Sequence, residues 1–452
     1  RSEYVAAWMG LTRLGIPAAH LGTSCTAAEL SALLDRSGIE QLVVSEATWP
    51  AVAQVLHDGP PRSLRVLHVG ERPPAPASGY HARVRDHRGK PPIRPAGELD
   101  AASVVYTSGT TGRPKGAVRD LAALGAMELL RVLERLPLRV GDRHLVVAPL
   151  YHSGAQAFTM INASLGATIV LMDHFEAASA LDRLSQDRIH SVFLVPTMIR
   201  RLLDLPAEHH ARRPTPALRA IVSGAAPFPD GLRRRAIERF GADVIFDFYG
   251  ATELGWVTLA SGHDMLARPG TLGPPLAGQE IRVVDEGGQP LPAGQVGKIY
   301  TRSAQHMRGY LDDEAATDEI REGGWVTVED LGYLDDDGHL YLTGRARDMV
   351  ISGGVNVYPV EVENVLSRHP AIREVAVIGL PDEMLGERVV AYLIAKPGHE
   401  LDRRELKAHC LDAMPFVRVP KEFVVVDELP QTASGKVSRS KLKQQLLEQA
   451  GG

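Results

Sequence analysis

One stretch of eleven residues, YTSGTTGRPKG from Tyr106 to Gly116, constrains this chain more than any other. Glycine lets the backbone turn where other residues would clash, and it lets a ligand approach the main chain. Successive free N–H groups in such a turn form a concave anion site, hydroxyl side chains add donors, and a lysine adds a positive point charge. The stretch predicts a loop that holds the phosphates of a nucleoside triphosphate, with these binding residues: Thr107, Ser108, Gly109, Thr110, Thr111, Gly112 and Lys115.

The residues around the loop limit its type. The apolar run over residues 103–106 predicts a short strand that leads into the loop. Because Lys115 is followed by Gly116, the G-x-x-x-x-G-K-[ST] spacing of the common P-loop is absent. The loop alone leaves two alternatives open, a mobile surface loop and the phosphate site of a kinase-like phosphotransferase.

Length and composition set broad limits. The 452 residues are enough for about three domains, and 44% hydrophobic with 23% charged residues is ordinary for a globular protein. A formal net charge of −5 gives no sign of a nucleic-acid or membrane-surface partner, and no apolar run is long enough to span a membrane. Two distant cysteines, Cys25 and Cys410, predict a reducing compartment, the cytoplasm. The chain begins at Arg1, within an expected helix from Tyr4 to Leu14, so we expect the natural N-terminus to be missing.

The middle of the chain alternates short apolar runs with segments of helical period. This pattern predicts β-α units and a large α/β domain with a mostly parallel, buried sheet, whose ligands lie beyond the carboxyl ends of the strands. The expected strands cover residues 144–150, 167–172, 192–196, 220–224 and 244–249, with helices over 181–189 and 231–240. Nearer the N-terminus we expect a buried strand over 41–44 and mostly loop over 59–97.

The pattern changes twice in the second half. Alternation over 280–284 and 297–302 predicts an antiparallel pair, and a small α+β unit is expected after Gly344. That unit should hold strands over 375–378, 389–394 and 423–426 and a helix over 401–414, which Asp402 and Glu405 start as a capping box. The predicted domains are 1–344 and 345–452.

Further strings end strands with residues suited to a nucleotide. In FYGATE, residues 248–253, Tyr249 can stack on a base, Gly250 and Thr252 can approach phosphate, and the Glu253 carboxylate suits Mg²⁺. Small residues at Gly224, Ala225 and Ala226 can form a flat shelf for adenine. Asp330 can accept both ribose hydroxyls, and Arg345 can donate to the same sugar; Asp247 completes the predicted nucleotide-binding set.

Two strings lie in the small unit. SGGVNVYPVEVE runs from Ser352 to Glu363, and a P-x-T-x-x-G-K-x-x-R pattern places Lys436 in a Gly/Ser loop after a strand. Together with the phosphate loop and FYGATE, and in this order, these strings resemble the signatures of the adenylate-forming superfamily, which includes acyl-CoA synthetases, luciferases and peptide-synthetase adenylation domains. The resemblance extends over nearly the whole chain.

The resemblance implies a two-step reaction in which ATP converts a small carboxylic acid into an acyl-adenylate, and coenzyme A then takes the acyl group. It implies ATP, Mg²⁺ and coenzyme A as cofactors, a mobile small domain, and the following roles. The catalytic residues are Lys436, Glu253 and Thr107, with Glu253 holding the metal; the hinge is Arg347; the channel for coenzyme A is Ser352, Gly353 and Gly354; and the acid-binding residues are His152, Gly250 and Trp256.

Several questions stay open at this level. His152 and Trp256 are as well explained by core packing as by a substrate pocket. Glu329 stands where the family usually has glycine before the ribose-binding aspartate, so the contact of Asp330 is less secure than the others. The acceptor could be a carrier protein instead of coenzyme A, and a non-catalytic nucleotide-binding homologue is a further alternative. The acid and the oligomeric state are not determined.

Overall fold

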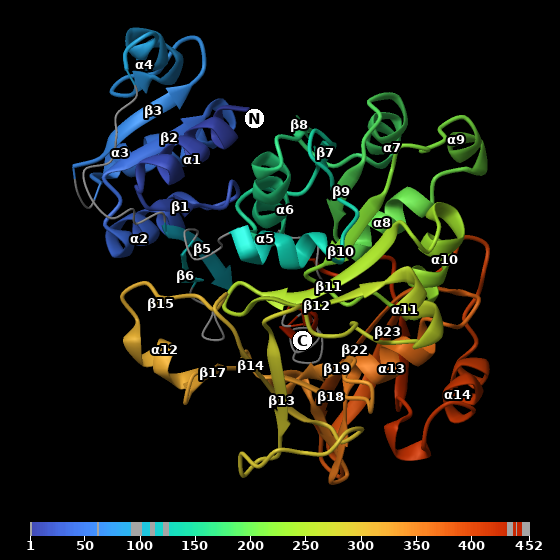
Figure 1. Ribbon diagram of the computed structural model, residues 1–452. Coiled ribbons are helices and arrows are strands. Elements are labelled where there is room, and N and C mark those ends of the chain that lie inside the picture. Colours follow the sequence, from blue (N-terminus) through green and yellow to red (C-terminus); the bar gives the residue numbers. More distant parts are fainter. Residues whose placement is uncertain are drawn as a thin grey trace.

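The computed structural model describes residues 2–60, 63–91, 102–108, 114–120, 126–431, 437–439 and 441–444. Five of the predicted site residues lie outside this part: Gly109, Thr110, Thr111, Gly112 and Lys436. Within it the chain is a mixed α/β protein with a large N-terminal region and a smaller C-terminal one (Figure 1), as predicted. No helix among the described residues is both long and apolar enough to cross a membrane.

The N-terminal part packs helices on a small parallel sheet. The helices α1 (Ser2–Leu14), α2 (Ala27–Ser37), α3 (Trp49–Asp58) and α4 (Tyr80–His87) accompany β1 (Ala18–His20) and a sheet of β2 (Gln41–Ser45), β3 (Arg65–Val69) and β4 (Ser78–Gly79). A capping box between Thr26 and Glu29 starts α2. Two expectations were wrong in part. The strand over 41–44 exists but is only partly buried, with Val44 buried and Val43 42% exposed. The supposed loop over 59–97 contains the helix α4.

The predicted phosphate loop connects two paired strands. β5 (Ala102–Ser108) and β6 (Pro114–Asp120) are antiparallel, and Thr107 stands opposite Lys115 in their register. Both strands belong to a sheet with the order β1-β5-β6-β15, in which β15 is Gly309–Tyr310. The sheet therefore carries both ends of the loop and places the 309–310 segment beside them.

The central six-stranded sheet confirms the β-α pattern. Its order is β12-β11-β10-β9-β7-β8, with β7 (Arg143–Val146), β8 (Thr168–Leu171), β9 (Ser191–Leu194), β10 (Ala220–Gly224), β11 (Ile245–Ala251) and β12 (Gly255–Ser261). All neighbours pair in parallel except β11 with β12. The accompanying helices are α5 (Ala126–Leu133), α6 (Ser153–Ser164), α7 (Ala177–Gln186), α8 (Pro196–Leu203), α9 (Ala207–Ala211), α10 (Asp230–Phe240) and α11 (Gly262–Ala267).

A mostly antiparallel sheet follows, and it includes the expected pair. β13 (Glu280–Val284) pairs with β14 (Gly297–Arg302), beside β16 (Arg321–Glu322), β17 (Trp325–Val326), β18 (Asp330–Leu334) and β19 (Leu340–Arg345). Helix α12 (Glu314–Glu319) precedes β16.

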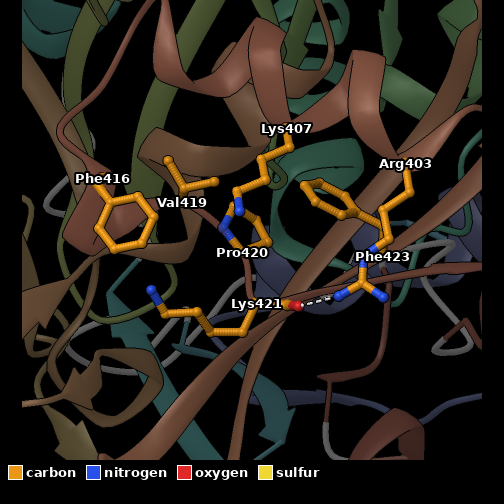
Figure 2. Close-up of a pocket in the computed structure, with 7 residues that line it drawn as sticks. All are labelled: Arg403, Lys407, Phe416, Val419, Pro420, Lys421 and Phe423. Carbon is orange, nitrogen blue, oxygen red and sulfur yellow. Dashed lines mark hydrogen bonds between the residues drawn. The ribbon is translucent and has the colours of Figure 1, made fainter.

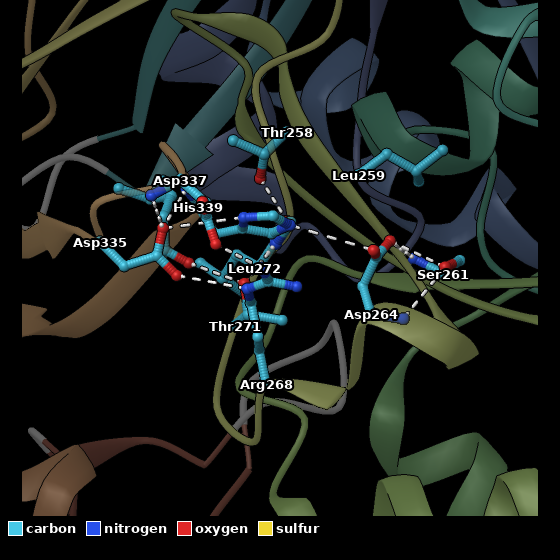
Figure 3. Close-up of polar contacts among 12 residues, drawn as sticks. Thr258, Leu259, Ser261, Asp264, Arg268, Thr271, Leu272, Asp335, Asp337 and His339 are labelled. Carbon is cyan, nitrogen blue, oxygen red and sulfur yellow. Dashed lines mark hydrogen bonds and ion pairs between the residues drawn. The ribbon is translucent and has the colours of Figure 1, made fainter. Parts of the chain in front are cut away.

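Polar contacts fasten this sheet to α11 (Figure 3). Arg268, after α11, bonds to Asp337 and lies 3.6 Å from Asp335. The His339 ring lies between Asp335 and Asp264 at 3.7 and 3.9 Å. These contacts hold the β18–β19 pair, and with it Asp330, against the central sheet.

The short helix η2 (Ala346–Asp348) follows β19 and leads into the C-terminal region, and the division at residues 344–345 stays a prediction. Its sheet contains β20 (Val350–Ser352), β21 (Val355–Val357), β22 (Ile372–Asp382), β23 (Gly386–Ala395) and β24 (Glu422–Val425), with the helices α13 (Pro359–Leu366), α14 (Arg403–Leu411) and η3 (Phe416–Arg418). Asp402 caps α14 by accepting from the N–H groups of Arg404 and Glu405, but the described contacts do not include the return bond from the Glu405 side chain that a capping box requires, and the helix is shorter than the expected 401–414. A hollow of about 100 Å³ beside α14 is lined by cationic and aromatic side chains, among them Arg403, Lys407, Lys421, Phe416 and Phe423 (Figure 2).

Among the described residues, two arginine side chains form hydrogen bonds between the regions. Arg368, after α13, donates to Asp230 at the start of α10 with a distance of 2.9 Å. Arg200, on α8, donates to the carbonyl of Arg373. The small region is thus connected to α8 and α10, two helices that accompany the central sheet.

Candidate active site

Glu253 lies in the turn between β11 and β12, and two other strands reach it. Its side chain is 8% exposed. Its Oε1 accepts a hydrogen bond of 2.9 Å from the Tyr310 hydroxyl and a longer one of 3.4 Å from Thr107 Oγ1. The structure therefore brings together two predicted catalytic residues, Thr107 and Glu253, that are 146 positions apart.

Lys115 adds a cation to this group. Its Nζ lies 5.1 Å from the centroid of the Tyr310 ring, a distance at which the ring face attracts a cation. Burial and the neighbouring Glu253 carboxylate raise the pKa of Tyr310 well above its ordinary value, so its hydroxyl keeps its proton and donates at physiological pH. A carboxylate, two hydroxyls and an ammonium thus surround the start of the predicted phosphate loop.

A second group of contacts is centred on Asp330. Its Oδ2 accepts from the Tyr249 hydroxyl at 2.8 Å, and its Oδ1 accepts from Arg345 Nε at 3.0 Å. The residue is 5% exposed; burial raises its pKa, and the Arg345 charge opposes that shift. Each carboxylate oxygen has one of these protein donors and a further lone pair, so Asp330 can accept two more hydrogen bonds, the number that a ribose diol offers.

Glu329 precedes Asp330 at the position where the resemblance led us to expect glycine. It adopts a left-handed conformation with φ 63°. Its N–H donates to Thr327 Oγ1 at 3.0 Å, and its carbonyl accepts from the N–H of Ala346 at 3.0 Å. The turn therefore forms with glutamate in a position that favours glycine, at a cost in backbone strain.

The small residues of the predicted nucleotide site are required by packing. A Cβ on Gly250 would lie 2.1 Å from the Gly255 carbonyl oxygen, and one on Gly224 would lie 2.9 Å from the carbonyl oxygen of Phe248. Ala225 has φ 66°, so the chain bends sharply after β10. Close strand contacts explain these glycines without a ligand, and the adenine shelf at 224–226 stays a prediction.

Asp247 and Thr252 have partners of their own. Asp247 is 2% exposed and forms a buried ion pair with Arg233, so the described contacts do not join it to Glu253 or Asp330. Thr252 Oγ1 lies 3.0 Å from Ser153 Oγ, at the start of α6. This hydroxyl pair links the FYGATE turn to the segment that carries His152.

The predicted acid-binding residues lie beside a cluster of aromatic rings. Trp256 stacks on Phe158 with centroids 5.5 Å apart and meets the edge of Phe248 at 6.0 Å. His152 is the N-cap residue of α6, and its ring lies 4.4 Å from the Tyr151 ring. Trp256 thus has the contacts that core packing requires, and its role toward a substrate stays a prediction.

The residues of the small region take three positions. Gly353 and Gly354, with φ 58° and 78°, form the two-residue turn between β20 and β21, where both central residues need positive φ. Ser352 is buried before that turn. Arg347 lies in η2, with its Nε 3.9 Å from Asp348 Oδ1. Lys436 lies outside the described residues, but its loop is closed at the base by a bridge between Gln431 and Val437.

Comparison with known proteins assigns the chain to a family. A model described as AMP-binding enzyme matches residues 1–311, and one described as AMP-binding enzyme C-terminal domain matches residues 361–436. The first match alone covers more than half of the chain. The protein is an AMP-binding enzyme. The resemblance to the adenylate-forming superfamily is confirmed, and at family level the chain is an AMP-forming acid–thiol ligase of the acyl-CoA synthetase kind.

Two relatives and one solved structure are similar to most of this chain, and their names give different activities. Feruloyl-CoA synthase from Amycolatopsis sp is 35% identical over 357 residues, which are 78% of this chain and 72% of that protein. The fatty acid–[acyl-carrier-protein] ligase ScoC from Streptomyces coeruleorubidus is 30% identical, over 98% of this chain and 84% of that one. The solved structure of the amide bond synthetase McbA from Marinactinospora thermotolerans matches with a TM-score of 0.88 and 27% identity, over 98% of this chain and 88% of that one.

The donor set of this AMP-binding enzyme suits a metal that arrives with its nucleotide. Among the described residues no group of three or more His, Cys, Asp or Glu side chains could hold a metal ion. Glu253 nevertheless has an Oε2 that accepts no hydrogen bond from the described residues, beside the Thr107 and Tyr310 hydroxyls that bond to Oε1. Mg²⁺ is commonly bound by one or two carboxylates with phosphate oxygens and water, and Glu253 fits that arrangement.

Sequence reasoning assigned no role to three residues that the structure places here: Tyr310, Ser153 and Arg119. Tyr310 follows a glycine in a short strand and carries no periodic signal. Arg119 lies on β6, four positions after Lys115, where it is partly buried and donates to the carbonyls of Thr252 and Gln305. Such a cation in a strand that enters a buried sheet is a usable signal, because it must find partners there.

Proposed function

We propose that this AMP-binding enzyme is an ATP-dependent acyl-CoA synthetase, which converts a carboxylic acid into an acyl-adenylate and then transfers the acyl group to coenzyme A. The main support is the pair of contact groups described above. Tyr249, Asp330 and Arg345 form a set suited to a ribose, and Thr107, Glu253 and Tyr310 meet at the strand that leads into the phosphate loop. A single nucleoside triphosphate carries both the ribose hydroxyls that suit the first group and the phosphate oxygens that suit the second.

The first step joins two anions. A carboxylate oxygen of the acid attacks the α-phosphorus, the bond to the bridging oxygen breaks, and pyrophosphate leaves. Lys115, and in this proposal Lys436, place positive charge where negative charge grows, and hydroxyl donors at the loop add to it. Mg²⁺ bound with the nucleotide would neutralise part of the triphosphate charge. A hydrogen bond to a charged group contributes about 1.5–3 kcal/mol, so a few such donors lower the barrier substantially.

The second step needs a thiol at the same carbonyl carbon. The sulfur attacks that carbon, and the thiol proton goes to solvent or to a base. The C–O bond between the acyl carbon and the phosphate oxygen breaks, and AMP leaves with its electron pair. The β20–β21 turn supports a route for a thin pantetheine arm, because a Cβ built on Gly354 meets no atom within 4 Å. Coenzyme A is the acceptor named for feruloyl-CoA synthase, whereas ScoC is named for a carrier protein.

The decisive assay separates activation from transfer. ATP–pyrophosphate exchange is measured over a panel of aliphatic, aromatic and dicarboxylic acids, and AMP release is then followed with coenzyme A, with a phosphopantetheinylated carrier protein, and with neither. We expect acid-dependent exchange, and rapid AMP release only with coenzyme A. Release of ADP, or no exchange with any acid, would overturn adenylation; AMP release that requires the carrier or an added amine would overturn the acceptor.

A further inference from the structure

Arg119 connects the strand after the phosphate loop to the turn that carries Glu253. It lies on β6 and is partly buried. Its Nη1 donates to the carbonyl oxygen of Thr252 at 2.8 Å, and its Nη2 donates to the carbonyl oxygen of Gln305 at 3.1 Å. No contact in the described chain pairs this guanidinium directly with a carboxylate within ion-pair distance.

The two carbonyls belong to a set of hydrogen bonds, here named the frame, that joins the turn of residues 252–256 to the facing segment of residues 305–307. The turn starts at Thr252, which Arg119 holds. Its middle is held by a bond of 2.9 Å from the N–H of Met307 to the carbonyl of Glu253. Its end is held by a bond of 3.0 Å from the N–H of Trp256 to Oε1 of Gln305. Arg119 is therefore the side chain that bonds to both the turn and the 305–307 segment facing it.

The frame leaves little freedom for the turn. Gly255 has φ 78°, and a Cβ there would lie 2.7 Å from Cβ of Gln305, so the two segments are already in close contact. A guanidinium donates in a fixed planar fork, whereas an ammonium on a flexible stem cannot reproduce two directed bonds at once. A loss of the fork releases the start of the turn, one residue before Glu253.

Arg119 keeps its charge in this position. Burial lowers its pKa to about 10, and the Glu253 charge opposes that shift. The guanidinium is therefore protonated near neutral pH, and it donates both hydrogen bonds as a cation. Because hydrogen bonds from a charged donor are stronger than neutral ones, the charge of Arg119 reinforces its hold on the turn.

We infer that Arg119 is a positioning residue, which fixes the Thr252–Trp256 turn so that the Glu253 carboxylate faces the phosphate loop while Trp256 stays on the aromatic cluster. The inference rests on the proposed role of Glu253 toward Mg²⁺-bound nucleotide. Arg119 then acts through Glu253, so the loss of the Arg119 guanidinium should weaken nucleotide binding with metal more than nucleotide binding without metal.

The test measures ATP binding by calorimetry over a range of Mg²⁺ concentrations, without acid or coenzyme A. The variant is Arg119→Lys, which keeps the charge and removes the fork. The matched control is Arg321→Lys, since Arg321 donates to the carbonyls of Met307 and Arg308 in the same segment but does not reach the turn. Urea midpoints report the folding of each protein.

We expect Arg119→Lys to raise the Mg²⁺ concentration for half-maximal ATP affinity about tenfold, the effect of losing one hydrogen bond of this kind, and Arg321→Lys to leave it within about twofold. In the Glu253→Gln background the effect of Arg119→Lys should disappear. An effect that persists there, or one that Arg321→Lys reproduces, overturns the inference. So does a drop in the urea midpoint that accompanies the binding loss both in Arg119→Lys and in the milder Arg119→Gln. A wild-type affinity that does not depend on Mg²⁺ would instead count against the proposed role of Glu253.

Discussion

At the scale of single residues, Glu253 holds a central position because strands from three parts of the chain place donors around it. Thr107 and Tyr310 bond to one of its oxygens, and Lys115 lies next to Tyr310. The carboxylate therefore has a fixed orientation before any ligand binds, which reduces the reorganisation that a reaction would otherwise require.

The first prediction changes this carboxylate. Glu253→Gln keeps the shape and the ability to accept from Tyr310, but a neutral amide is a poorer ligand for Mg²⁺. We expect ATP–pyrophosphate exchange to fall about 10²–10³-fold at limiting Mg²⁺, the range found for the loss of one preorganised group, with an unchanged urea midpoint. Wild-type exchange at limiting Mg²⁺ would show that Glu253 is not a metal ligand.

The second prediction concerns backbone strain at Glu329. A non-glycine residue in the left-handed region costs about 1–2 kcal/mol, and glycine has no such penalty but gains freedom in the unfolded chain. We therefore expect Glu329→Gly, at φ 63°, to raise the free energy of unfolding by up to about 1 kcal/mol. The loss of its 4.0 Å contact with Lys298 matters little, because both side chains are well exposed.

Chemical denaturation of Glu329→Gly and of Glu322→Gly provides the comparison. Glu322 lies on β16, and its φ is not among the positive ones, so glycine there should destabilise the protein. Equal losses in the two variants would mean that the 329 turn stores no strain.

At the scale of elements, a buried polar chain crosses the central sheet. His144 on β7 lies 2.9 Å from Ser191 Oγ on β9, and that hydroxyl donates to Asn162 on α6 at 3.2 Å. All three side chains are almost completely buried. The chain ties α6, whose N-cap residue is His152, to the sheet behind it.

The third prediction is a pH dependence of stability from this element. Burial lowers the pKa of His144 to about 3, below its unfolded value near 6.5. The native ring stays neutral while the unfolded ring takes a proton, so stability is complete above pH 6.5 and falls as the pH decreases toward 3. One such proton changes the free energy of unfolding by about 1.4 kcal/mol per pH unit.

We expect His144→Asn to reduce the slope of the free energy of unfolding against pH between pH 6 and pH 4, by the amount that corresponds to about one bound proton. The buried His20 and the partly buried His306 also have pKa values lowered to about 4 and add their own slopes, so the difference between the two proteins is the quantity to measure. Parallel curves for wild type and variant would contradict the prediction.

At the scale of the whole molecule, the small region has its own core, and hydrogen bonds such as those of Arg368 and Arg200 join it to the large one. Arg439 pairs with Glu363 at 2.7 Å and lies 3.7 Å from Asp348 in η2. The base of the Lys436 loop is therefore connected to the segment where the two regions join. A movement there would carry the loop with it.

The fourth prediction follows from two demands on one carbonyl. Lys436 is expected near the α-phosphate in the first step, and a pantetheine arm must reach the same carbon in the second. We expect the small region to rotate about Arg347 between them, since hinges are a few residues at element ends. Proline fixes φ near −65°, which the first turn of a short helix such as η2 tolerates.

Arg347→Pro should leave one half-reaction near the wild-type rate and slow the other, measured as pyrophosphate exchange and as thioester formation from supplied acyl-adenylate. Arg347→Ala, which removes the side chain but not the freedom of φ, should slow neither. If proline slows both alike in a folded protein, or neither, the domains do not alternate about this residue.

Local pattern was sufficient for much of the architecture. The alternation of apolar runs and helical segments predicted the parallel sheet of β7 to β11, because a strand buried on both faces needs a continuous apolar run. The motif strings marked Glu253, Tyr249, Asp330 and Arg345, since glycines, hydroxyls and charges at the ends of strands are rare without a reason. The short helix α4 was missed because its charged, weakly periodic sequence has little apolar pattern to indicate a helix.

Tertiary structure alone decided which of these residues meet. Thr107 and Glu253 approach across 146 positions, and Tyr249 reaches Asp330 across 81. Nothing in the local sequence marked Tyr310 as a donor to Glu253 or Arg119 as the residue that bonds to Thr252 and Gln305. The physical reason is that periodicity records which face of an element is buried, whereas the partner of a polar side chain depends on how sheets from distant parts of the chain pack together.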